Sequence, residues 1–398
     1  MPERGSAKRT AQWRKVAFGD VVRLNTERSS DPESDGFERY IGLEHIEPGN
    51  LRVRRWGDID NGVTFTCVFR PGQVLFGKRR VYQRKVAVAD FSGVCSSDIY
   101  VFEPKDQSML PELLPFICQS DAFLNHAVET SAGSLSPRTN WRSLAAFEFK
   151  LPPVDEQHRI ADALTEVEEY ASAMDQLAEA ASRLEESLGT EFFSEVISNA
   201  GCPLSDVAYE DITRTEVSAT KQYRTVGVLN SGEGLFVKDE LSGSNTKYSQ
   251  LNVLRRHQLV MRKLTAWEGA IAVVPPEHEG AVVSAEFPTM TIRQNAMLPE
   301  FATWLVRQPL FWTEMKARSR GTALRRSRLH QRDLLSIRVK LPTLDEQRRI
   351  ASALSDTRCA SQIAKSRSRQ TRSFLNLLRE ELLFGDATAA TKLFVERS

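Results

Sequence analysis

The chain has 398 residues, a formal net charge of +1 at pH 7 and five scattered cysteines. This length predicts two to three domains, no stretch approaches the 18 uncharged apolar residues of a membrane span, and the polar start at residues 1–10 lacks the apolar core of a secretory signal. Because no two cysteines form a CxxC pair, the sequence predicts neither a zinc site nor a disulfide framework, and we expect free thiols in a reducing cytoplasm.

The first part of the chain is a series of short β-rich runs followed by a helical stretch. We expect a mobile tail over residues 1–12 and a helical stretch over 110–130. A Gly-bearing loop follows at 131–134. The β-rich runs are closed by turn residues and lie at residues 13–21, 40–46, 73–78, 86–89, 94–102 and 147–150.

The same succession occurs a second time. A helical stretch is expected over 299–319 and a Gly-bearing loop over 319–322. The matching β-rich runs lie at residues 202–207, 225–229, 258–263, 270–274, 281–292 and 337–340. Each unit therefore has the pattern of a mixed α+β domain, and about 140 residues are enough to bury a core.

A 14-residue motif closes each unit and defines the repeat. It reads LPPVDEQHRIADAL from Leu151 and LPTLDEQRRIASAL from Leu341, with 10 identical positions, and the two copies begin almost half a chain length apart. Proline at the head suits a position before or just inside a helix, and the Asp-Glu pair places negative charge at the positive end of the helix dipole. The motif predicts two long helices, over 156–197 and 346–384, each about 60 Å long at 1.5 Å per residue.

The two predicted helices should pack on each other in antiparallel orientation. In the first, apolar residues from Ile160 to Phe192 follow the four-three spacing of a coiled coil, interrupted by Glu185. The second keeps the phase but has a polar middle, where we expect looser pairing. Residues 151–199 have a charge balance of −10 and residues 341–398 one of +3, and opposite charge favours pairing.

Motifs of catalysis are not found in the sequence. It has no GxGxxG after a strand, no GxxxxGK[ST], no HExxH and no GxSxG, and the six histidines are isolated. The sequence therefore predicts neither catalytic nor metal-binding residues. A self-contained nuclease or methyltransferase and a coiled-coil scaffold without a DNA role are retained as alternative hypotheses.

Nucleic-acid binding is better supported, because basic residues cluster at predicted turns in both units. Arginine can bind phosphates or guanine edges in a bidentate manner, and the run 138–142 contains further side chains able to read bases. The candidate DNA-binding residues are Arg52, Arg54, Lys78, Arg79, Arg80, Arg84, Arg138, Asn140, Arg142, Arg262, Lys263, Arg318, Arg320, Arg325, Arg326 and Arg328.

The motif pair, following two α+β units, resembles the specificity subunit of type I restriction–modification enzymes. The resemblance implies an α+β chain with two similar target-recognition domains (1–150 and 200–340), two antiparallel coiled-coil spacer helices (151–199 and 341–398) and a pseudo-two-fold internal repeat. The motif positions carried over as partner-docking or helix-docking residues are Pro152, Glu156, Gln157, Ile160, Leu164, Val167, Pro342, Glu346, Gln347, Ile350 and Leu354; Val167 continues the apolar seam of the first helix.

The resemblance also implies a function. Each domain would read half of a bipartite site in double-stranded DNA, and the helices would set the spacing and dock two modification (methyltransferase) subunits. The chain itself would be non-catalytic and without cofactor, with S-adenosylmethionine, ATP and Mg in the modification and restriction subunits of a cytoplasmic complex. A DNA-recognition subunit of another defence assembly is the remaining alternative.

Overall fold

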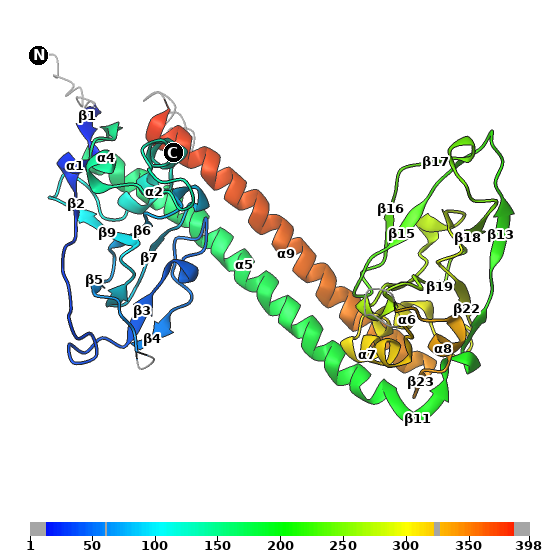
Figure 1. The fold of residues 1–398 in the computed structure, drawn as a ribbon. Helices are drawn as coiled ribbons and strands as arrows, with labels where there is room; N and C mark the ends of the chain where they lie inside the picture. Colours follow the sequence, from blue (N-terminus) through cyan, green and yellow to red (C-terminus); the bar gives the residue numbers. More distant parts are fainter. Residues whose placement is uncertain (1–12, 60–61, 322–326, 386–398) are drawn as a thin grey trace, which may run out of the picture. The chain divides into compact units, whose positions relative to one another are not determined.

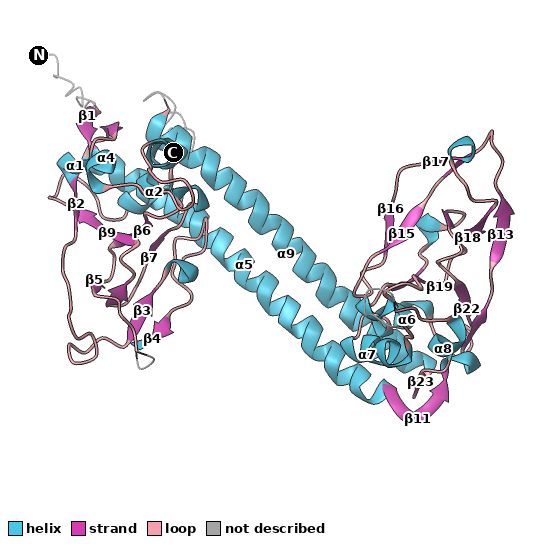
Figure 2. Cartoon of the chain, in the orientation of Figure 1, coloured by secondary structure: helices cyan, strands magenta, loops and turns pink. Residues whose placement is uncertain are grey.

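The computed structural model describes residues 13–59, 62–321 and 327–385. The chain divides into two compact units: Met1–Gln176 with Ala364–Ser398 form unit 1, and Leu177–Ile363 form unit 2. The division passes through two long helices, α5 (Val154–Val196) and α9 (Leu344–Phe384), so each unit holds a globular part and half of each helix (Figures 1 and 2). The expected tail at 1–12 lies outside the described residues.

Unit 1 is built on two four-stranded sheets. The first has the order β2-β9-β6-β7 and is antiparallel throughout; the second has the order β4-β3-β8-β5, with β3 and β8 parallel. A separate ribbon pairs β1 with β10. The strands are β1 (Arg14–Ala17), β2 (Val22–Leu24), β3 (Arg39–Ile41), β4 (Gly57–Asp58), β5 (Cys67–Phe69), β6 (Val74–Gly77), β7 (Val86–Val88), β8 (Gly93–Cys95), β9 (Ile99–Pro104) and β10 (Glu148–Leu151).

Short helices cover the first sheet of unit 1. The expected helical stretch at 110–130 is two helices, because Ser120 ends α2 and its hydroxyl caps α3 by accepting a hydrogen bond from the Phe123 amide at 3.1 Å. Phe18, Phe76, Phe102 and Phe123 pack together in the core. The helical elements are α1 (Phe18–Val21), η1 (Leu43–His45), η3 (Val81–Gln83), α2 (Leu114–Gln119), α3 (Asp121–Glu129) and α4 (Trp141–Ala145).

Unit 2 repeats the first sheet of unit 1. Its order β12-β22-β19-β20 reproduces β2-β9-β6-β7 strand for strand. In place of the second sheet, unit 2 has a three-stranded sheet, β13-β18-β21, and two two-stranded sheets, β14-β17 and β15-β16. The strands are β11 (Ile197–Pro203), β12 (Ala208–Glu210), β13 (Thr213–Glu216), β14 (Gln222–Tyr223), β15 (Val226–Val228), β16 (Leu235–Val237), β17 (Leu241–Ser242), β18 (Gln250–Val253), β19 (Gln258–Met261), β20 (Ile271–Val273), β21 (Val282–Val283), β22 (Thr289–Ile292) and β23 (Arg338–Val339).

The helices of unit 2 match those of unit 1 in order. The expected stretch at 299–319 is again two helices, and here Pro309 begins the second one, as suits a residue without an N–H at a helix start. The helical elements are η4 (Leu204–Asp206), η5 (Gly243–Asn245), η6 (Ala266–Glu268), η7 (Pro276–His278), α6 (Pro299–Leu305), α7 (Pro309–Arg318) and α8 (Gln331–Leu335). The α+β fold with an internal repeat is confirmed.

The repeated motif joins each long helix to its own globule through a buried glutamine. In unit 1 the Gln157 side chain accepts a hydrogen bond from the Leu110 amide (2.8 Å) and donates to the carbonyls of Ser108 and Pro152. In unit 2 Gln347 makes the same three bonds, with the Leu298 amide and the carbonyls of Ala296 and Pro342. Both glutamines are fully buried. We refer to each as a glutamine clamp.

Antiparallel pairing of the helices is visible within each unit. In unit 1 Leu164 of the first half of α5 shares a core with Leu375 and Leu382 of the last half of α9. In unit 2 the last half of α5 and the first half of α9 bring Phe193 and Leu354 into one core. Among the described residues, no helix is both long and apolar enough to cross a bilayer.

The polar middle of α9 corrects one expectation. Ser361 and Ser368 are buried in the seam and pair specifically, Ser361 with the hydroxyl of Ser182 at 2.9 Å in unit 2 and Ser368 with the carboxylate of Asp175 in unit 1. Glu185, which interrupts the apolar run of α5, forms an ion pair with Arg358 at 3.0 Å. The seam in these places is therefore held by hydrogen bonds and ion pairs, not left loose.

Candidate nucleic-acid interface

In unit 1 three loops are joined into one surface, which we call the three-loop face. It consists of the β6–β7 loop (78–85), the β8–β9 turn (96–98) and the α3–α4 loop (131–140). The Lys78 amide donates to the Asp98 carbonyl (2.9 Å), the Arg80 amide donates to the Pro137 carbonyl (2.7 Å), and the Thr139 amide donates back to Lys78 (3.0 Å). These backbone bonds hold the loops in a defined arrangement.

Asp98 organises the charges of this face. Arg138 donates to Asp98 at 2.9 Å and Arg79 at 3.3 Å. Burial alone would raise the pKa of Asp98, but the hydrogen bonds and charges of these two arginines outweigh it and lower the pKa. The carboxylate therefore stays ionised and orients both guanidinium groups, which remain 39% and 50% exposed at Arg79 and Arg138. Arg80 and Arg142 are exposed beside them.

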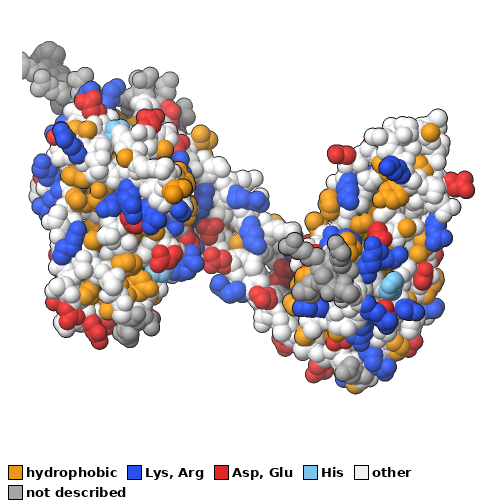
Figure 3. Space-filling model, in the orientation of Figure 1, with side chains coloured by type: hydrophobic (Ala, Val, Ile, Leu, Met, Phe, Trp, Pro, Cys, Tyr) orange, Lys and Arg blue, Asp and Glu red, His pale blue; other side chains and the backbone are white. Residues whose placement is uncertain are grey.

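Unit 2 contains the same face with the same backbone bonds. The Lys263 amide donates to the Glu286 carbonyl (2.9 Å), and the Thr265 amide donates to Ser327 (3.0 Å). Arg328 is bonded to Glu286 at 3.0 Å, as Arg138 is to Asp98 in unit 1. Two structurally equivalent surfaces with exposed arginine are the arrangement expected of two readers of phosphates and base edges. Figure 3 shows Lys and Arg over the visible face of each unit, with Asp and Glu among them.

The structure places only part of the predicted DNA-binding set on these faces. The residues on the face of unit 1 or beside it are Lys78, Arg79, Arg80, Arg84, Arg138, Asn140 and Arg142; those of unit 2 are Arg262, Lys263, Arg318, Arg320 and Arg328. Arg325 and Arg326 lie outside the described residues.

Several candidates, including three on the faces, have structural contacts within the chain. Arg52 forms an ion pair with Glu169 of α5 (3.0 Å), and Arg54 donates to the Ser172 hydroxyl (2.8 Å), so both attach the globule of unit 1 to its helix. Arg84 is paired with Asp121. The Asn140 side chain caps α4 by accepting from the Ser143 amide (2.9 Å), and Arg262 is bonded to Glu268 (3.0 Å). Each of these five side chains therefore has a partner within the chain, and its position does not require a contact with DNA.

The motif residues assigned to docking serve mainly the chain's own packing. The two glutamine clamps, Ile160, Leu164 and Leu354 are buried within their units, so they dock the helices to the globules and cannot touch another subunit. Pro152 and Pro342 supply carbonyls to the clamps, and Ile350 packs against the unit 2 core. Glu156 accepts from the Trp13 indole (2.8 Å), and Glu346 forms a capping box with Thr343, whose bonds lower the pKa of that carboxyl.

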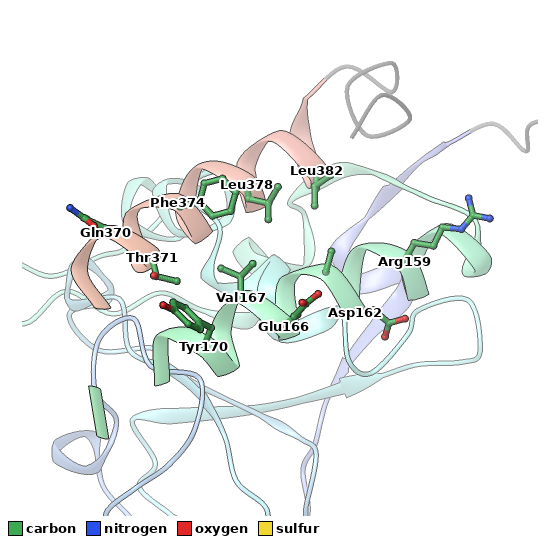
Figure 4. Close-up of a pocket in the computed structure, with 11 residues that line it drawn as sticks. Arg159, Asp162, Glu166, Val167, Tyr170, Gln370, Thr371, Phe374, Leu378 and Leu382 are labelled. Carbon is green, nitrogen blue, oxygen red and sulfur yellow. The ribbon is translucent and has the colours of Figure 1, made fainter. Parts of the chain in front are cut away.

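Val167 borders a groove that the sequence did not indicate. The groove lies in unit 1 between the facing halves of α5 and α9 and has a volume of about 830 Å³. Figure 4 shows Tyr170 and Val167 on α5 opposite Phe374 and Leu378 on α9, with Asp162 and Glu166 along the α5 side. Tyr170 is 48% and Phe374 54% exposed. We call this surface the helix groove.

The helix groove cannot be predicted from the helical pattern, because its aromatic side chains are exposed beside the seam and not buried in it. Phe374 and Tyr170 lie next to the seam positions in the helical pattern, and a pattern alone does not separate an apolar residue inside the seam from one beside it. The repeat offers a signal: in the register that aligns the two motifs, Tyr170 and Val167 correspond to Ala360 and Thr357, and Phe374 to Leu184. The aromatic side chains that border the groove in unit 1 are therefore not repeated at the equivalent positions of unit 2.

Comparison with known proteins agrees with this architecture. Residues 12–180 match the family model of the type I restriction modification DNA specificity domain. The EcoDI specificity subunit of a type I restriction enzyme from Escherichia coli is 28% identical over 138 residues, which are 34% of this chain and 30% of that protein. The match thus spans less than a third of the curated relative.

Solved structures resemble the chain over nearly its whole length. The S subunit of a type I restriction–modification system from M. genitalium superposes with a TM-score of 0.58 at 12% identity, covering 96% of this chain and 99% of that one. A chain from a structure of a type I R-M system gives 0.53 at 18% identity, covering 94% and 98%.

The fold is that of the S subunits of type I restriction–modification systems. The domain match at residues 12–180 and this fold make the chain similar to type I specificity subunits.

Proposed function

We propose that the chain is the sequence-specific DNA-binding subunit of a type I restriction–modification system. The observation that carries this function is the duplicated three-loop face, built with equivalent backbone bonds in both units. Each face reads one half of a bipartite site in double-stranded DNA, and the two long helices set the spacing between the halves. A scaffold without a DNA role gives no reason for the same loops, with exposed arginines, to occur twice.

The exposed basic side chains divide into two roles. Arg80, Arg142 and Arg320 are exposed and positioned to meet phosphates, which supply affinity and position the protein without reading sequence. Arg79 and Arg138 are oriented by Asp98, and a guanidinium held by a carboxylate can present its remaining N–H groups to a guanine edge.

The first prediction concerns the phosphate contacts. Arg142→Ala or Arg80→Gln in unit 1, and Arg320→Ala in unit 2, are each expected to weaken DNA binding about tenfold and to reduce the slope of log K against log salt by about 1. The measurement is fluorescence anisotropy with a duplex carrying the motif enriched from a random library, over a series of salt concentrations.

Arg348→Ala provides the matched control for this experiment. Arg348 is an exposed arginine on α9, paired with Asp345 and away from both faces, and its loss should leave affinity and slope unchanged. Absence of any enriched motif with the unmodified chain would favour the scaffold hypothesis.

We also propose that chemistry is supplied by other subunits. Two modification subunits would bring S-adenosylmethionine and methylate the DNA, and restriction subunits would bring ATP- and Mg-dependent translocation and cleavage. The similarity of residues 12–180 to the type I specificity domain supports this division of labour. Methyl transfer or DNA cleavage by the purified chain alone would contradict it and favour a self-contained enzyme.

The helix groove is the surface we assign to a modification subunit in unit 1. It is apolar, exposed and formed by the two helices themselves, and exposed apolar patches of this kind mark protein interfaces. Phe374→Ser is expected to weaken association with the modification subunit about tenfold, because exposed aromatic residues dominate such interfaces. Pull-down titration with the co-expressed subunit measures this effect.

Two variants control for general effects on α9 and for the repeat. Leu377 is 72% exposed on the next turn of α9 but does not border the helix groove, so Leu377→Ser should leave association intact. Leu184→Ser alters the position that corresponds to Phe374 in unit 2 and should have a smaller effect. If Phe374→Ser and Leu377→Ser weakened association with the modification subunit equally, the helix groove would not be part of the interface.

A further inference from the structure

Two apolar side chains are exposed on the basic three-loop face of unit 1. Leu135, in the α3–α4 loop, is 89% exposed, and Tyr82, in the β6–β7 loop, is 56% exposed. Leu135 is the most exposed large apolar side chain among the described residues. Burying a large apolar side chain stabilises a fold by about 1.5–3 kcal/mol, so the exposure of these two side chains does not serve folding.

The backbone that presents Tyr82 is constrained. Arg80 (φ 53°) and Arg84 (φ 56°) frame the short η3 turn, and both are non-glycine residues in the left-handed region. Such conformations are sparsely populated and cluster at functional sites. The turn therefore holds the ring outside the core at some conformational cost.

The same turn occurs in unit 2 and again contains an aromatic residue. Thr265 (φ 56°) and Gly269 (φ 73°) frame η6, and Trp267 occupies the position of Tyr82. The two turns align without a gap, since the offset along the sequence is the same for the framing positions and for the aromatic one. An aromatic residue at the centre of a turn with a left-handed residue at each end is thus a feature of the repeat. Trp267 is half-buried, so the inference is drawn for unit 1 alone.

Leu135 is tied to the same surface through its own loop. Ala132 and Arg138 exchange backbone hydrogen bonds of 3.0 and 2.9 Å, which close the loop around Leu135, and Pro137 accepts the bond from Arg80 that joins this loop to the Tyr82 turn. Arg80 lies two residues before Tyr82, and Arg138 lies three residues after Leu135.

The chemistry of these side chains indicates which part of DNA each would contact, the bases or the phosphates. Arginine and lysine neutralise phosphates, whereas an exposed ring or an aliphatic side chain gains nothing from a phosphate. A ring stacks on the flat face of a base, and leucine is among the residues that enter between base pairs as wedges. The neighbouring arginines would hold the DNA backbone while the apolar groups meet its bases.

We propose that Tyr82 and Leu135 contact the bases of the half-site read by unit 1, Tyr82 by stacking and Leu135 by insertion at a base step. This proposal rests on the proposed DNA-binding function. It adds an unstacking contact within the half-site, and it requires no hydrogen bond to a base edge.

The experiment uses the full chain and the enriched duplex with 2-aminopurine substituted at successive positions. The unmodified chain should raise the fluorescence at one step of the unit 1 half-site, because 2-aminopurine brightens when it loses its stacked neighbours. Tyr82→Ala and Leu135→Ser should abolish this rise and weaken binding about tenfold, with the slope of log K against log salt unchanged. Tyr82→Phe and Leu135→Met should retain both signals, since they keep the ring and the apolar volume.

The outcomes separate this proposal from the proposed function. Sequence-specific binding that survives Tyr82→Ala and Leu135→Ser at full strength, with the fluorescence rise intact, would overturn the base contacts and leave the function standing. A reduced salt slope in these variants would also overturn them, because it would place the lost contact at the phosphates. Failure of the unmodified chain to enrich any motif would overturn the function and the base contacts together.

Discussion

Replacing Arg372 with Ala is expected to lower the free energy of unfolding of unit 1 by about 4 kcal/mol, because it leaves one buried and one partly buried carboxylate without their cation. Arg372 of α9 pairs with Asp175 at 2.5 Å and lies 3.5 Å from Glu168, both on α5. It also donates to the Gly49 carbonyl at 2.6 Å and so joins both helices to the globule. Glu168 is only 5% exposed.

The loss should depend on pH with a defined sign. Burial raises the pKa of Glu168, and the Arg372 charge offsets part of that rise. The folded state therefore holds this proton more tightly than the unfolded chain, and the cost of ionising Glu168 appears as the pH rises through its folded pKa. Without the Arg372 charge the pKa of Glu168 rises further, so ionising Glu168 in the folded state costs more free energy.

Asp175 acts in the same direction. Burial alone would raise the pKa of Asp175, but the hydrogen bond from Ser368 and the ion pair with Arg372 outweigh it and lower the pKa. The stability from Asp175 is present above the ordinary carboxyl pKa of 3.8 and is lost as the pH falls through the lowered value. Arg372→Ala removes the part of this gain that comes from Arg372, so the difference between variant and unmodified chain should widen from acid to neutral pH.

Denaturant unfolding, with hydrogen exchange read over residues 164–176, measures this difference. Arg367→Ala, on an exposed position of the same helix, is the matched control and should change the free energy of unfolding little at any pH. Adding Glu168→Gln to Arg372→Ala should recover part of the loss at neutral pH. A pH-independent difference would mean that the carboxylates are not the groups affected.

This cluster shows what the sequence could and could not reveal. The repeat, the helix limits to within two residues and the antiparallel pairing follow from spacing and charge, which are local properties of the chain. The pairing of Asp175 with Arg372 and Ser368 does not, because nothing in a linear pattern indicates which polar residue of one helix meets which of another. For this reason the sequence pattern alone predicts loose pairing at the polar middle of α9.

The candidate DNA-binding residues show a similar limit. Clustered arginines indicate a basic surface, but Arg52 and Arg54 are as basic as Arg80 and turn out to contact α5. Their role depends on residues of that helix which lie far from them in the sequence. Alignment of the two β-hairpin loops, by contrast, could have singled out Tyr82 and Trp267 from the sequence alone, because their flanking strands match without a gap.

The glutamine clamps give the second large effect. Gln157→Ala is expected to lower the free energy of unfolding of unit 1 by about 3 kcal/mol, because it leaves the Leu110 amide and the carbonyls of Ser108 and Pro152 without the partner that satisfies them in the buried clamp. Gln347→Ala should have the same effect on unit 2, where the three bonds are repeated. Gln362→Ala, at an exposed position of α9, should change little.

Gln157→Glu tests the chemistry of the clamp more sharply than truncation. The introduced carboxyl keeps an acceptor for the Leu110 amide, but an ionised oxygen would face two carbonyl oxygens where the amide donated. Burial beside these dipoles raises the pKa of such a carboxyl in the folded state. The variant should thus be most stable at acid pH and lose stability as the pH rises through the raised pKa.

The Gln157→Glu variant also separates clamping from simple packing. A neutral carboxyl group has nearly the shape of the amide but only one donor, so packing alone predicts no loss in the free energy of unfolding at acid pH, where the carboxyl is protonated. A loss that remains at acid pH would show that the two donated hydrogen bonds hold the helix to the globule. In the proposed function the two long helices set the spacing between the half-sites, and both clamps lie at the starts of these helices. Loss of a clamp should then weaken binding to the proposed bipartite site more than binding to either half alone.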